Sequence, residues 1–143
     1  MANPDSFNLA RFVKTQSENY TDALNELRRG RKVSHWMWYV FPQFAGLGRS
    51  DMAKRYAIGS VAEAEAYLAH LVLGPRLVEC CEAVLAVEGK SALAILGSPD
   101  DMKLKSCVTL FAAVSPHGSV FEQVLAKYYD GTPDEATLRL IDG

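Results

Sequence analysis

Apolar residues recur every three or four positions along most of this chain, which is the spacing of amphipathic helices. The segment 99–114 is the most regular, with five positions on one helical face: Leu104, Cys107, Val108, Phe111 and Val114. Segments that alternate between apolar and polar positions, as half-buried strands do, are absent from the sequence. The pattern predicts an all-α fold.

Capping residues and glycines set the expected helix bounds. Ser60 and Ser119 are each followed three residues later by a glutamate, which is the capping-box pattern. Ser98 and Thr132 each precede a proline and two acidic residues, a pattern typical of helix starts. Glycines stand where helices should end: Gly59, Gly89, Gly97 and Gly131. These signals predict helices at about 60–71, 74–87, 91–96, 99–114, 119–129 and 133–141.

The N-terminal part is predicted to hold further short helices. The first follows Asn3 and Pro4, which suit a first helical turn, and the second runs from Ser17 to Arg29. The apolar run 34–41 fits either a buried strand or a buried helix.

We predict a short helix for this run, capped by Ser34 and ended before Pro42, because no second strand is available to pair with it. A turn at 46–48 and a helix over 49–58 follow. The expected architecture is one domain, residues 1–143, of about seven to nine short helices.

Length and composition narrow the class of protein. A chain of 143 residues can bury a core without disulfides or metals. No apolar run approaches the ~20 residues of a membrane span, and the N-terminus lacks signal-peptide character, so a cytoplasmic protein without a membrane role is expected. The three cysteines lack metal-ligand spacing, so no metal site or cofactor is predicted. Buried thiols are the expected state, because Cys80 and Cys107 fall on apolar helix faces.

Positive charge is concentrated between residues 28 and 55. Seven basic residues there accompany one acid, Asp51: Arg28, Arg29, Arg31, Lys32, Arg49, Lys54 and Arg55. The segment therefore carries +6 and the remainder −8, since the chain totals −2. Such a local reversal attracts an anion, although a solvated basic helix end explains it equally well. The acidic remainder argues against a nucleic-acid partner.

The candidate acid–base residues are His35 and Asp101. His35 lies between Ser34 and Trp36, where partial burial could tune it as a proton carrier. A hydrogen-bonded histidine at the edge of a core is the commoner role for such a residue. Asp101 lies in a second polar cluster, at 100–109, most of which is expected to be a solvated helix face.

The candidate ring-binding residues are Trp36 and Trp38. Two positions apart on a helix they point in different directions, so one can pack inside while the other lines a surface. The exposed one could stack on a base or nicotinamide ring. The Gln43 amide either binds a ligand edge or closes a turn.

Further candidates are polar or cationic. Arg31, Lys32 and Arg49 are the predicted phosphate-holding residues, and the glycine-rich turn 46–48 would add backbone N–H donors. Thr109 lies between apolar neighbours and is expected to face inward, toward the aromatic segment.

The string Gly-Arg-Lys-x-Ser-His-Trp-Met-Trp-Tyr-Val-Phe-Pro-Gln at 30–43 is similar to the signature of a small bacterial family known as domain of unknown function 1810. Further similar motifs are Gly-Leu-Gly-x-Ser at 46–50 and Asp-x-Lys-Leu-x-Ser at 101–106. The resemblance extends from about Phe7 to Ile141. It implies an all-helical fold and no established activity.

A fainter likeness is to the NADAR proteins, which act on ADP-ribose derivatives. Their Ser/Thr-Glu-His-Tyr-x-x-Gln helix is loosely similar to the segment from Ser34 through Gln43, and their later lysine-rich helix to 101–125. The glutamate of that motif is missing from the matching place here. The departure argues against N-glycosidic catalysis and leaves nucleotide binding open.

Two functions from different classes remain. One is the binding or processing of a phosphorylated, nucleotide-like small molecule, of the ADP-ribose type, at residues 31–49. The alternative is a non-catalytic interaction module whose basic aromatic surface binds an acidic partner. If the aromatic segment is entirely core, the function lies elsewhere. A pocket on which His35, Gln43 and one tryptophan converge would favour the first.

Overall fold

A computed structural model describes residues 5–143, and these residues form nine helices around one apolar core. The helices are α1 Ala10–Arg28, α2 Met37–Val40, α3 Asp51–Arg55, α4 Val61–Ala69, α5 Leu73–Ala86, α6 Ala92–Leu96, α7 Asp100–Ala113, α8 Val120–Tyr129 and α9 Glu135–Asp142. Within this range there is no sheet, and one isolated parallel bridge joins Phe44 to Ile58. The predicted all-α fold is confirmed. None of the helices over 5–143 is long and apolar enough to cross a membrane.

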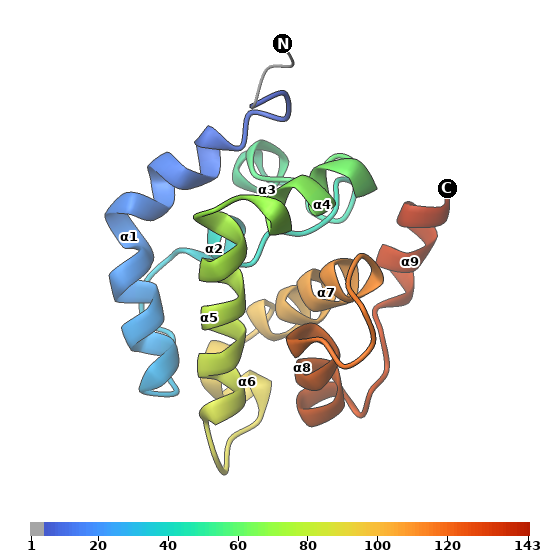
Figure 1. The fold of residues 1–143 in the computed structure, drawn as a ribbon. Helices are drawn as coiled ribbons and strands as arrows, with labels where there is room; N and C mark the ends of the chain where they lie inside the picture. The colour runs from blue at the N-terminus through green and yellow to red at the C-terminus, as the bar shows by residue number, and fades with distance from the viewer. Residues whose placement is uncertain (1–4) are drawn as a thin grey trace.

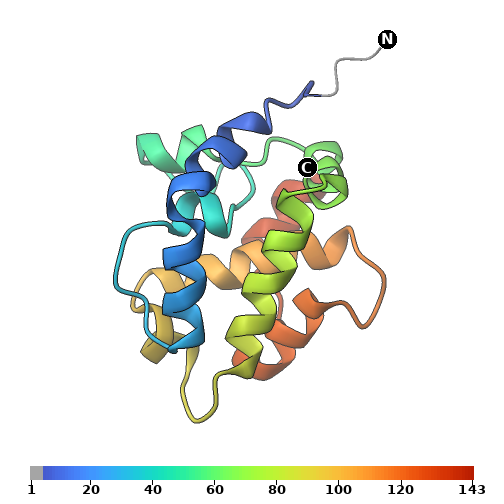
Figure 2. The ribbon, with the colours of Figure 1, turned by 60° about the vertical axis from the view of Figure 1, so that its left-hand side comes forward.

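Helix α5 occupies the middle of the molecule. It packs against α1 on one side and α8 on the other (Figure 1). Helix α7 packs on α8 and runs across the α1–α5 pair, which is clearest in Figure 2. Four rings connect these layers: the centroid of Tyr67 lies 5.1 Å from that of Phe12 and 5.4 Å from that of Phe111, which is 5.7 Å from that of Phe121. The core is therefore continuous from α1 to α8.

One long helix, α1, replaces the two helices predicted before Gly30. The prediction was wrong because it took Ser17 as a helix start. In the structure the Ser17 hydroxyl donates to the Lys14 carbonyl at 2.7 Å, and the Thr15 hydroxyl donates to the Arg11 carbonyl at 3.0 Å. Polar side chains that bond back to the preceding turn can stay inside a helix. Asn3 and Pro4, the expected start, lie outside the described residues.

The capping boxes are confirmed, and the two proline-based starts are not. Ser60 Oγ accepts the N–H of Glu63 at 3.0 Å, and Ser119 Oγ accepts that of Glu122 at 3.3 Å. Neither Ser98 nor Thr132 caps a helix: the N-cap of α7 is Pro99, without a side-chain cap, and that of α9 is Asp134. The Asp134 carboxylate accepts the N–H of Thr137 at 3.2 Å, and carboxylates are good caps.

The aromatic run 34–41 contains a helix, as predicted, but only over Met37–Val40. Ser34 does not cap it, because its hydroxyl donates to Glu26 instead. Helix α3 is also shorter than the predicted 49–58, and Ser50 caps it by accepting the Ala53 N–H at 3.1 Å.

The three cysteine thiols are free and buried, as expected: Cys80, Cys81 and Cys107. Burial raises the pKa of the Cys80 thiol to about 12 and raises those of the other two well above the ordinary value. Such thiols are packing groups rather than nucleophiles.

Candidate functional site

A closed loop of residues 43–58, which includes helix α3, forms the wall of the candidate site. The Ile58 N–H donates to the Gln43 carbonyl and the Ala45 N–H to the Ile58 carbonyl, each at 2.9 Å. Gly46 adopts a φ of +104°, which favours glycine, and packs against Leu140 of α9. A Cβ atom at Gly48 would lie 2.4 Å from the Cβ of Ala53, so only glycine fits there. The glycine-rich turn is thus tightly packed against α3 and α9.

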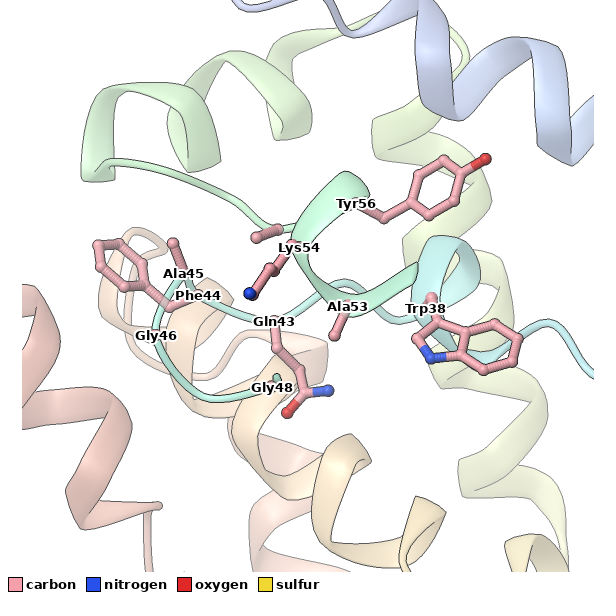
Figure 3. Close-up of a pocket in the computed structure, with 10 residues that line it drawn as sticks. Trp38, Gln43, Phe44, Ala45, Gly46, Gly48, Ala53, Lys54 and Tyr56 are labelled. Carbon is pink, nitrogen blue, oxygen red and sulfur yellow. The ribbon is translucent and has the colours of Figure 1, made fainter. Parts of the chain in front are cut away.

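A pocket of about 240 Å³ lies between this loop, α2 and α3 (Figure 3). Its walls are mostly small or aromatic: Trp38, Gln43, Phe44, Ala45, Gly46, Gly48, Ala53, Lys54, Tyr56 and Ala57. Figure 3 shows the Gln43 side chain extending between Gly48 and the ring of Trp38. An aromatic ring, an amide and a cation therefore share one small cavity.

Two polar side chains of this pocket, those of Gln43 and Lys54, are not engaged with the rest of the protein, whereas the Tyr56 hydroxyl lies 2.8 Å from that of Thr15. Within residues 5–143, Lys54 forms no ion pair and the Gln43 side chain forms no hydrogen bond. Trp38 is partly buried, and Lys103 Nζ lies 5.6 Å from the centroid of its ring. An amide and an ammonium group facing a small cavity are suited to binding a polar ligand.

The two tryptophans have different environments. Trp36 is only 1% exposed, and its indole Nε1 donates to Glu26 at 2.9 Å. Its ring contacts Phe41, with the centroids 6.1 Å apart. Because Trp36 belongs to the core, it cannot stack on a ligand from solvent, and the predicted ring-binding role is left to Trp38.

Glu26, which the sequence analysis missed, holds the segment before α2 in place. Its Oε1 accepts the N–H groups of Val33 and Ser34 at 2.7 and 2.9 Å, and it also accepts the Trp36 indole N–H. Its Oε2 accepts the Ser34 hydroxyl. Burial acts to raise the pKa of this carboxyl, and these hydrogen bonds outweigh burial and lower the pKa to about 2. In the sequence, the only sign of this anchoring role was an acidic residue beside the apolar face of α1.

Lys32 does not present a free charge. Its Nζ lies 3.0 Å from Asp100 Oδ2, and its side chain is only 9% exposed. The same ammonium lies 5.2 Å from the centroid of the Trp36 ring. Lys32 thus ties the segment before α2 to the start of α7, which conflicts with the prediction that it holds phosphate. Arg31 and Arg49 are exposed, and neither lines the pocket.

The predicted acid–base residues also lie outside this pocket. His35 is exposed, and its carbonyl accepts the Tyr39 hydroxyl at 3.1 Å. Asp101 accepts the Tyr129 hydroxyl on its carbonyl at 2.5 Å, and its buried Oδ1 has no hydrogen-bond partner in the described part of the chain. The expected convergence of His35, Gln43 and a tryptophan is therefore met only by Gln43 and Trp38.

Thr109 faces the C-terminal helices rather than the aromatic segment. Its hydroxyl donates to the Lys105 carbonyl at 2.8 Å and accepts the Asp134 N–H at 2.9 Å. It lines a different pocket, of about 460 Å³, in which His117 Nδ1 lies 3.3 Å from Glu122 Oε2. Over residues 5–143, no group of three His, Cys, Asp or Glu side chains is placed to hold a metal ion.

Lys54 lines the pocket, but the sequence pattern did not single it out as a site residue. It was counted among the seven basic residues, but nothing in the sequence separated it from Arg49 or Arg55. Its direction depends on how α3 packs against the 43–58 loop.

Comparison with known proteins places this structure in a family. Residues 6–141 match the family described as "Protein of unknown function (DUF1810)". The crystal structure of the conserved hypothetical protein Rv1873 from Mycobacterium tuberculosis is similar, with a TM-score of 0.94 and 50% sequence identity, covering 96% of this chain and 98% of that chain. No curated protein matches the chain. These matches give no support to the fainter NADAR likeness. The chain belongs to the DUF1810 family of proteins of unknown function.

Proposed function

We propose that this protein binds a small phosphorylated molecule with an aromatic ring, in the pocket lined by Trp38, Gln43 and Lys54. The observation that carries the proposal is that these three side chains line one cavity of about 240 Å³. An aromatic face binds a planar ring, an amide binds its polar edge, and an ammonium group binds an anion.

Charge supports an anionic ligand over a neutral one. Lys54 is in α3, and Arg49 and Arg55 lie on the same short segment, with Asp51 as its one acid. None of the three cations is in an ion pair within residues 5–143. A cluster of unpaired cations beside a cavity raises the local concentration of anions.

The proposal is binding rather than catalysis. The two predicted acid–base residues, His35 and Asp101, do not line the pocket. A general acid or base must come within hydrogen-bond reach of the reacting atom. Nucleotides and phosphosugars, ADP-ribose among them, are the ligands to test first.

The test is thermal unfolding in the presence of this panel. A ligand at roughly 100 times its Kd stabilises the folded state by about 2.7 kcal/mol. For a domain of this size each kcal/mol raises the melting temperature by roughly 2–8 °C. The variant Lys54→Gln should reduce the shift, whereas Arg31→Gln, which removes an exposed cation that does not line the pocket, should leave it unchanged.

Trp38→Phe is the second variant. It should keep the fold and remove the quenching of tryptophan fluorescence by the ligand, because Trp36 is buried away from the pocket. A melting temperature that stays flat across the whole panel would refute the proposal.

One observation favours the alternative of an interaction module. Just before α2, Arg31 and His35 are exposed and Val33 is 70% exposed. The Arg31 cation beside an exposed apolar side chain suits the surface of an acidic partner. If the panel is inactive, this reading predicts that a poly-glutamate peptide binds in low salt and that Arg31→Glu abolishes the binding.

A further inference from the structure

We infer that the pocket takes a single ring with a hydrogen-bond donor and an acceptor on one edge, carrying one phosphate, and that it leaves the second half of any dinucleotide outside. This ligand class covers nucleoside monophosphates and nicotinamide mononucleotide. The inference rests on the proposed function and makes it specific.

The size of the pocket gives the first argument. Pockets that enclose a drug-sized ligand have volumes of roughly 300–1,000 Å³, and this one has about 240 Å³. Its outer wall is fixed, because the 43–58 loop is closed by two backbone hydrogen bonds and packed against Leu140 and Ala53. A ring with its nearest substituents fits such a volume, and a second nucleoside does not.

Gln43 gives the second argument. Its side chain lines the pocket, and neither the N–H₂ group nor the carbonyl oxygen of the side-chain amide forms a hydrogen bond within the described residues. Its own backbone is fixed, since its carbonyl accepts the Ile58 N–H. A ring that covers this amide without pairing to it leaves buried polar groups unsatisfied, which costs about 1–3 kcal/mol. A nucleobase or carboxamide edge offers the matching acceptor and donor.

Trp38 and Lys54 define where the two parts of the ligand lie. Lys103 Nζ lies over the Trp38 ring and 3.7 Å from Asp100 Oδ1, so a salt bridge at the start of α7 helps to fix the indole. Lys54, an exposed residue, is the one basic residue that lines the pocket within residues 5–143. The ring is therefore placed beside Trp38 and Gln43, and the phosphate beside Lys54.

The experiment is isothermal titration of the full-length chain with two kinds of probe. Probes of the first kind carry a ring edge with a hydrogen-bond donor and acceptor: AMP, UMP and nicotinamide mononucleotide. The other lacks part of the ligand or adds to it: phenyl phosphate has the ring and phosphate without the edge, ribose 5-phosphate lacks the ring, and ADP-ribose adds a second sugar phosphate. We expect the best edge-bearing monophosphate to bind about tenfold more tightly than phenyl phosphate and ribose 5-phosphate. ADP-ribose should bind within about threefold of AMP.

The matched variant is Gln43→Met, which keeps the length of the side chain and removes both hydrogen-bonding groups. It should lower the affinity for the best monophosphate about tenfold and leave phenyl phosphate binding unchanged, with an unaltered melting temperature in the absence of ligand.

The outcomes separate this inference from the proposed function. ADP-ribose binding more than tenfold tighter than every monophosphate overturns the size limit. Selection by the hydrogen-bonding edge is overturned if phenyl phosphate binds as tightly as the best monophosphate. It is also overturned if Gln43→Met binds the best monophosphate as tightly as wild type does. In these cases a phosphorylated ring still binds and the proposed function stands. If no phosphorylated probe binds, both fail.

Discussion

Replacing Glu26 by glutamine tests how the segment before the pocket is anchored. Glu26 is 5% exposed, and its carboxylate accepts hydrogen bonds from two backbone N–H groups, the Ser34 hydroxyl and the Trp36 indole. Glutamine keeps one carbonyl acceptor at nearly the same place. It loses the charge that strengthens all four bonds.

The expected loss of stability follows from the pKa of the Glu26 carboxyl. The pKa of Glu26 is lowered from its ordinary value of 4.5 to about 2. At 1.36 kcal/mol per pH unit, this difference corresponds to about 3 kcal/mol of stability for the ionised carboxylate. Because the folded-state pKa is the lower one, this stability is fully present above pH ~4.5 and is lost as the pH falls toward 2.

The assay is urea unfolding of both proteins at several pH values. Glu26→Gln should reduce the free energy of unfolding at pH 7 by about 2–3 kcal/mol, and the gap between variant and wild type should narrow below pH ~4. Glu65→Gln is the control, because Glu65 is exposed on α4, and its effect should stay within about 0.5 kcal/mol. A loss under about 1 kcal/mol for Glu26→Gln, with a gap that does not change with pH, would refute this account of the anchor.

Three further outcomes test the packing. Trp36→Ala should cost about 3–5 kcal/mol in urea unfolding, whereas Trp38→Phe should cost under about 1.5 kcal/mol; equal costs would contradict their different burial. Gly48→Ala should cost about 1–3 kcal/mol, because its methyl would meet Ala53, and a variant as stable as wild type would show that the loop yields. Thiol titration should detect almost no reactive cysteine until denaturant is added, and rapid labelling of the native protein would contradict the burial of all three: Cys80, Cys81 and Cys107.

Local signals in the sequence were enough to predict most helices. The bond from the Glu63 N–H to Ser60 joins residues within one turn, and so does the bond from the Glu122 N–H to Ser119. Such bonds form whatever the rest of the chain does, so the sequence alone determines them. At Ser17 the same kind of local signal gave a wrong prediction of a helix start. A serine hydroxyl can cap a helix or donate to the preceding turn inside one, and Ser17 does the latter.

The site depended on tertiary structure, because burial and ion pairing there join distant parts of the chain. The basic segment was evident from the sequence, but only packing decided that Lys32 forms an ion pair with Asp100 of α7 while Lys54 lines a cavity. Packing likewise buried Trp36 against Glu26 and left Trp38 at the pocket wall. Composition and spacing determine which charges and rings a chain carries. Their availability to a ligand depends on partners from other helices, which local pattern does not encode.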